Sequence, residues 1–130
     1  MRSSIIIIAM LGMLGASCSS NDGLEHVAEL KASEIVGTPV TSRNIMFAVQ
    51  RSQYGGATGE TLYKVWSCTQ GRRDCRLQAT VDTNDMTPPK VSIVSGAVTI
   101  VADDGDTIWN FCNRAPSRQG PSLKVGLVYR

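Results

Sequence analysis

Histidine and aromatic side chains are scarce in this sequence. His26 is the single histidine among 130 residues, and aromatic residues make up 5% of the chain. A hydrolytic triad would have to use His26, and no second histidine or further cysteine pair lies at the spacing of a metal site. The chain also lacks a nucleophile elbow. We therefore expect no catalytic residues, no metal and no other cofactor.

Long apolar runs and a strong excess of one charge are also missing. The longest apolar run, residues 5–16, is shorter than the roughly 18 residues that a membrane-spanning helix needs. There are 13 basic and 11 acidic residues, and the sequence pI is about 8.4. This balance gives no reason to expect a nucleic-acid partner. A hydrophobic content of 42% is that of an ordinary globular domain.

The first seventeen residues have the composition of an export signal. Arg2 supplies a positive charge, residues 5–16 form an uncharged apolar core, and small residues follow. Residues 14–18, LGASC, resemble the lipobox of bacterial lipoproteins, in which the cysteine is acylated and becomes the mature N-terminus. The resemblance implies a signal peptide over 1–17 and a diacylglyceryl group on Cys18. Alternatively, an ordinary signal peptidase cuts after Ala16 or Ser17 and leaves Cys18 as a disulfide partner.

An acylated Cys18 would place the protein in the bacterial cell envelope, held at a membrane by its lipid chains. Two or three acyl chains give stable anchoring, whereas one chain binds only marginally. By resemblance to enterobacterial lipoproteins, Ser19 favours the outer membrane, with the protein facing the periplasm.

Export also decides how the remaining cysteines are interpreted. In an oxidising compartment, Cys68 and Cys75 are expected to form a disulfide that closes a short loop between two strands. Cys112 would then be the odd cysteine, a buried thiol in an apolar stretch. A disulfide from Cys68 or Cys75 to Cys112 is the alternative, because sequence alone does not fix connectivity.

The rest of the chain predicts a mainly β fold. We divide it into a tether with one short helix over 18–40 and a β-rich domain over 41–130. The helix is expected within 21–37, with Leu24, Val27 and Ile35 on one face and Asp22 and Glu25 at capping-box spacing. Runs rich in β-branched residues then predict strands over 45–51, 61–68, 75–81, 90–94, 97–102, 107–112 and 123–130.

Short connections between these runs favour an antiparallel meander, either a small sandwich or a half-barrel. Ser95-Gly96 and residues 103–106 are expected turns, and Pro88-Pro89 marks a loop. The glycines of 54–61 suit a bend better than a phosphate loop, because no lysine and helix follow them. Residues 82–85 and 103–106 are aspartate-rich, but neither has the ligand order of an EF-hand, so solvated turns are the simpler interpretation.

Two further resemblances bear on function. Residues 45–112, with the segment MFAVQRSQYGGATGETLYKV, resemble small bacterial exported proteins that carry a Gly-Ala-Thr segment and have no assigned activity. Residues 95–109, SGAVTIVADDGDTIW, are similar to the Ser-Gly-Ala and Trp-bearing region of periplasmic lysozyme inhibitors, which are small β-barrel lipoproteins. The second resemblance implies an inhibitor or immunity protein against a lysozyme-like hydrolase or toxin.

Charge is distributed in blocks, acidic over 19–40, basic over 41–81, acidic over 82–106 and basic over 107–130. If the basic strands and residues 113–122 share a face, that face suits an acidic protein, an anionic lipid or a lipopolysaccharide phosphate. The alternative is a mixed, solvated surface, since four arginines fall in expected loops: Arg72, Arg73, Arg114 and Arg118.

We expect a non-catalytic binding or accessory module with a possible protein partner in the envelope. A binding module should expose aromatics such as Tyr54, Trp66 or Trp109, although both tryptophans are expected in the core.

Overall fold

The structure is a computed structural model that describes residues 25–53, 61–83, 87–118 and 120–130. Its regular elements are strands and one 3-10 turn, which are, in chain order, β1 (His26–Glu29), η2 (Ala32–Glu34), β2 (Ile35–Ser42), β3 (Ile45–Gln53), β4 (Thr61–Gln70), β5 (Arg73–Thr83), β6 (Lys90–Val94), β7 (Ala97–Ala102), β8 (Thr107–Trp109), β9 (Arg114–Ala115) and β10 (Leu123–Tyr129). The mainly β class expected from the sequence is confirmed.

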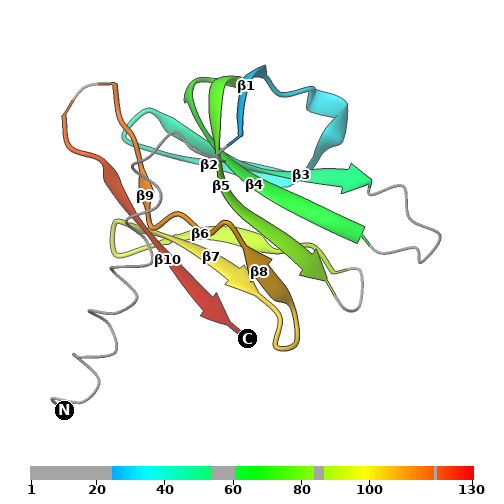
Figure 1. Ribbon diagram of the computed structural model, residues 1–130. Coiled ribbons are helices and arrows are strands. Elements are labelled where there is room, and N and C mark those ends of the chain that lie inside the picture. Colours follow the sequence, from blue (N-terminus) through cyan, green and yellow to red (C-terminus); the bar gives the residue numbers. More distant parts are fainter. Residues whose placement is uncertain (1–24, 54–60, 84–86, 119) are drawn as a thin grey trace, which may run out of the picture.

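The strands form two open sheets that pack face to face (Figure 1). The large sheet has the order β1-β5-β4-β3-β2, with β8 also paired to β5, and the small sheet has the order β6-β7-β10-β9. All pairs are antiparallel except β10 with β7, which is parallel. The expected meander is therefore wrong at this point: after β7 the chain crosses to the large sheet as β8 and returns through β9 before β10 runs alongside β7.

The main core lies between the two sheets. Alternate residues of each strand point to opposite faces, so every second residue of the central strands faces this layer. The large sheet contributes Val65 and Val81, and the small sheet contributes Val98 and Ile100, all of which are fully buried. Val91 and Ile108 pack against the edges of this cluster.

A second apolar cluster covers the outer face of the large sheet, and it explains why the expected N-terminal helix does not form. Leu30 packs there with Trp66 and Leu77, and Val27 and Ile35 pack against the cluster. The described part of the expected helix, residues 25–37, is instead β1, η2 and the start of β2. The apolar residues still face the body, but β1 gains a backbone ladder with β5 that an isolated short helix would lack.

Two-residue turns connect the two strands within each of two hairpins that flank the main core. Arg43 and Asn44 link β2 to β3, with φ of 52° and 66°. Ser95 and Gly96 link β6 to β7, with φ of 52° and 80°, so this expected turn is confirmed. Positive φ at both turn residues matches the twist of paired strands. The expected strands over 90–94 and 97–102 also match the structure residue for residue.

The predicted disulfide between Cys68 and Cys75 is confirmed. The two residues lie opposite each other on β4 and β5, with their Cα atoms 4.0 Å apart. Cys112 is buried and is also disulfide-bonded, so the expectation of an unpaired thiol there was wrong. No cysteine of the described residues is a free thiol.

Candidate functional site

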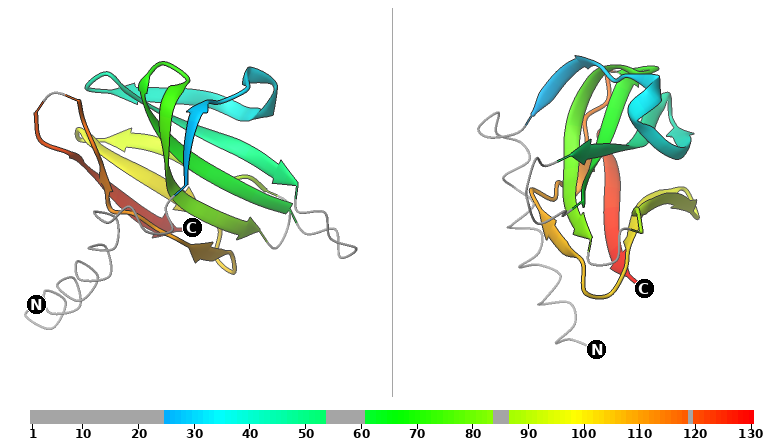
Figure 2. Two further views of the ribbon diagram at one scale, coloured as in Figure 1. Left: turned by 45° about the horizontal axis from the view of Figure 1, so that its top comes forward. Right: turned by 90° about the vertical axis from the view of Figure 1, so that its right-hand side faces the viewer.

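A pocket of about 390 Å³ opens at one end of the sandwich. Three connections meet at this end: the β2–β3 turn, the end of β4 and the segment that follows β9 (Figures 1 and 2). The residues that line the pocket share hydrogen-bonding or cationic side chains, apart from one isoleucine: Arg43, Asn44, Ile45, Thr69, Ser117 and Arg118.

The β2–β3 turn presents its two residues to the pocket because both adopt the left-handed conformation. Asn44 tolerates this conformation better than most residues do, because its short amide side chain bonds locally. Ile45, the next residue, is 1% exposed and belongs to the main core. The turn is thus held by its hairpin on one side and by a buried anchor on the other, while the Arg43 side chain remains exposed.

The segment that carries Ser117 and Arg118 is fixed by a buried glutamine. The register of β4 and β5 shifts between Val65 and Trp66, which makes Gln78 the extra residue of a β-bulge. Its Nε2 donates to the carbonyl oxygens of Cys112 (3.0 Å) and Arg114 (3.2 Å), and its Oε1 accepts from Ser67 Oγ at 2.7 Å. The backbone N–H of Cys112 donates in turn to the carbonyl of Gln78 at 2.7 Å. A bulge commonly redirects a side chain in this way.

Behind the pocket, Thr69 belongs to a short polar chain. Its Oγ1 donates to Asp74 Oδ2 at 2.5 Å, and Asp74 Oδ1 lies 2.7 Å from Nε2 of His26. A carboxylate only accepts, so this nitrogen of His26 carries the proton. The two hydrogen bonds, that from Thr69 first, lower the pKa of Asp74 below its ordinary 3.8, with the charges of His26 and Arg76 adding to them. Burial acts in the opposite direction and is outweighed.

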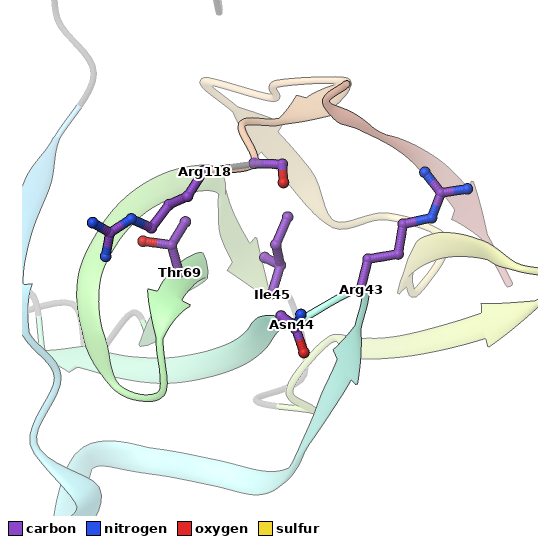
Figure 3. A pocket seen from close by; sticks show the side chains of 6 residues that line it. Arg43, Asn44, Ile45, Thr69 and Arg118 are labelled. Atoms are coloured by element: carbon purple, nitrogen blue, oxygen red, sulfur yellow. The ribbon is translucent and has the colours of Figure 1, made fainter. Parts of the chain in front are cut away.

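The electrostatics of the pocket favour an anion. Among the described residues, no carboxylate lines it, and neither Arg43 nor Arg118 forms an ion pair. Figure 3 shows the two arginines on opposite sides of Ile45, with their guanidinium groups turned away from each other. Both side chains are exposed and have the length to swing toward a bound group. Arginine, amide and hydroxyl donors are the usual ligands of phosphate and carboxylate groups.

One of the four arginines that the sequence analysis singled out lies at this pocket. Of the four loop arginines singled out, Arg118 lines it, whereas Arg72, Arg73 and Arg114 do not. Arg72 donates to the carbonyl of Leu30 at 3.1 Å and so fastens β1 to the β4–β5 turn.

The two tryptophans differ in exposure. Trp66 is buried as expected and donates to Gln50 Oε1 at 2.8 Å. Trp109 was also expected in the core, but it is 48% exposed, because β8 alternates and Ile108 takes the inward position. Tyr54 lies outside the described residues, as do Cys18 and its expected lipid.

The glycine-rich and aspartate-rich segments do not form sites within the described chain. The 54–60 glycines and residues 84–85 lie outside it, and 103–106 is a turn in which Asp106 accepts from the N–H of Asp103 at 2.9 Å. Within the described ranges, no group of three or more His, Cys, Asp or Glu residues is arranged to hold a metal. Ser95 and Trp109, which belong to the segment that resembles lysozyme inhibitors, lie apart in the fold: Ser95 is in the β6–β7 turn of the small sheet, and Trp109 ends β8 on the large sheet.

Sequence reasoning missed Arg43, Asn44, Thr69 and Ser117. The signal for the first two was present: the polar pair Arg43-Asn44 stands between a run rich in β-branched residues, 35–42, and an apolar run, 45–49, which is a hairpin pattern. No comparable signal exists for Thr69 or Ser117, because their meeting depends on the crossover from β7 to β9.

Comparisons with known proteins add no family or relative. No family model, curated protein or solved structure matches the chain. In the described part of the chain, no helix has the length and apolar character to cross a membrane.

Proposed function

We propose that the protein is an exported lipoprotein of the bacterial envelope, anchored through Cys18, whose β-sandwich is a non-catalytic module that binds an anionic group of an envelope partner. The observation that carries the binding role is the pocket: two arginines without carboxylate partners flank an opening lined by amide and hydroxyl groups. The export signal and the lipobox-like segment of residues 1–18 support the location.

The pocket favours binding over chemistry. A general base or nucleophile needs a partner that activates it, and the one histidine of the chain bonds to Asp74 on the far side of Thr69. Two arginines instead supply charge and bidentate donors, which recognise a phosphate or carboxylate without reacting. A small anion alone should bind weakly, with a Kd in the millimolar range, and a larger partner would add contacts around the rim.

The binding role is tested by titrating the full chain, purified in detergent, with inorganic phosphate while following backbone amide shifts by NMR. The shifts should be confined to residues that line the pocket. Arg43→Ala combined with Arg118→Ala should weaken binding at least about tenfold, because both cationic ligands are lost. The matched control is Arg51→Ala, an exposed arginine on β3 outside the pocket. Equal binding by the double variant and the control would overturn the proposal.

Assaying inhibition of a lysozyme in the same samples tests the alternative implied by residues 95–109. Strong inhibition that survives loss of Arg43 and Arg118 would replace the anion-binding role with that of an inhibitor.

The anchor is tested by the intact mass of the native protein. Acylation predicts a mature chain that begins at Cys18 and is heavier by its diacylglyceryl group. The measurement also decides between the two fates expected for this cysteine, because one sulfur cannot hold both a thioether and a disulfide. A Cys18–Cys112 peptide found after non-reducing digestion, without added lipid mass, would contradict the lipid anchor. Such a result would still be consistent with export of the protein.

A further inference from the structure

The outermost strand of the small sheet, β6, leaves one edge open. Among the described strands β6 pairs only with β7. The two-residue turn Ser95-Gly96 makes Val94 and Ala97 a hydrogen-bonded pair, so the N–H and C=O groups of Val94 and Ser92 point toward β7. By alternation, those of Val91 and Ile93 point to the open edge.

This edge combines backbone groups that have no partner among the described residues with exposed apolar side chains. Ile93 lies opposite Val98 and therefore faces the core side of the sheet, yet it is 41% exposed. Val94, on the other face, is 60% exposed. Lys90 is the only charged residue of the strand, and Pro89, which has no N–H, precedes it. An open edge of this composition is a template for another strand.

We propose that β6 pairs antiparallel with β6 of a second copy of the chain, about a two-fold axis at Ser92. In this register Val91 lies opposite the partner's Ile93, and Lys90 lies opposite the partner's Val94. Each Val91–Ile93 pair exchanges two backbone hydrogen bonds, because these are the residues whose N–H and C=O groups face the edge. The two small sheets then form one continuous sheet.

The sequence of β6 favours a second copy over an unrelated strand because the strand is self-complementary. Apolar residues meet apolar residues on the core side, so the exposed face of Ile93 becomes covered by the partner's Val91. The two lysines are kept apart, since each lies opposite a valine. A strand of five residues gives a small interface, and we therefore expect a weak, concentration-dependent dimer.

Cysteine cross-linking tests the register. In the proposed dimer Ser92 faces its own copy at a non-hydrogen-bonded position, where Cα atoms are about 4.5 Å apart, within disulfide range. Ser92→Cys should therefore form a disulfide-linked dimer under mild oxidation. Val94→Cys is the matched control, because it lies on the same strand and face but its two copies would be separated by about 13 Å along the strand. Chance collision in a shared detergent micelle affects both variants alike.

A second measurement keeps the proposal independent of engineered cysteines. Amide hydrogen exchange of Val91 and Ile93 should slow as the concentration of the wild-type chain rises toward about 1 mM. Ser92→Lys places like charges directly opposite each other and should weaken this protection about fivefold. Equal cross-linking at 92 and 94, no cross-linking at 92, or exchange that is independent of concentration would each overturn the proposal. None of these results depends on the anion pocket.

Discussion

Replacing Gln78 by leucine should destabilise the protein more than any other single polar substitution in its interior. Gln78 is fully buried and joins three elements, since it accepts from Ser67 on β4 and donates to the carbonyls of Cys112 and Arg114. Leucine has a similar volume but no polar atom. The variant therefore keeps the packing and loses three side-chain hydrogen bonds, which leaves a hydroxyl and two carbonyls without these donors or acceptors.

The expected loss follows from those bonds. A side-chain hydrogen bond contributes a net of about 1 to 1.5 kcal/mol, so three of them give about 3 to 4 kcal/mol. A domain of this size has a total stability of roughly 5 to 15 kcal/mol. At about 4 °C or more per kcal/mol, the melting temperature should fall by at least about 12 °C. The segment that carries Ser117 and Arg118 should also loosen, so phosphate binding weakens.

Urea denaturation followed by tryptophan fluorescence measures this loss. Gln70→Leu is the control, because Gln70 is exposed at the end of β4 and its substitution should change stability by less than about 0.5 kcal/mol. Ser67→Ala removes only one of the three bonds and should fall between the two. A loss below about 1 kcal/mol for Gln78→Leu, or one equal to that of Gln70→Leu, would show that Gln78 does not hold the 112–118 segment.

Two further predictions concern the β4–β5 hairpin. Replacing Cys68 and Cys75 together by alanine opens an eight-residue ring and should lower the free energy of unfolding by about 2.5 kcal/mol, measured by urea denaturation; an unchanged midpoint would contradict the estimate. The pKa of Asp74 in the folded state lies below 3.8, whereas its pKa in the unfolded chain is about 4. The ionised carboxylate therefore stabilises the folded state fully above the unfolded pKa. This stabilisation is lost as the pH falls through the lower pKa of the folded state. As the pH falls below about 4, the wild-type protein should therefore lose stability more steeply than Asp74→Asn. Melting temperatures of the two that fall in parallel below about pH 4 would refute the assignment.

The strands were predictable where local pattern and burial agree. Residues 90–94 and 97–102 are rich in β-branched side chains and flank Ser95-Gly96, and this hairpin matches its prediction residue for residue. The expected helix, with Val27 and Ile35 on its apolar face, failed because that apolar spacing fits two structures. In a helix these residues would form a stripe, but here a backbone ladder with β5 and the outer face of the large sheet take them up.

The pocket was less predictable than the strands because it depends on topology. Arg118 was singled out, but its nearness to Arg43 requires the crossover from β7 to β9, which no local pattern encodes. Cys112 illustrates the same point. Its apolar surroundings correctly indicated burial, whereas its disulfide-bonded state could not be deduced from the local sequence.

The location of the pocket separates the proposed binding of an anion from the stability of the fold. Arg43 and Arg118 are exposed and carry charge without ion pairs among the described residues, so their replacement removes little that the folded state needs. Gln78 holds the pocket in shape from the interior, and its replacement affects both properties. If the arginines bind an anion, their alanine variants should lose binding at wild-type stability, whereas Gln78→Leu should lose both. That difference distinguishes a pocket built for a ligand from arginines that only solvate one end of a sandwich.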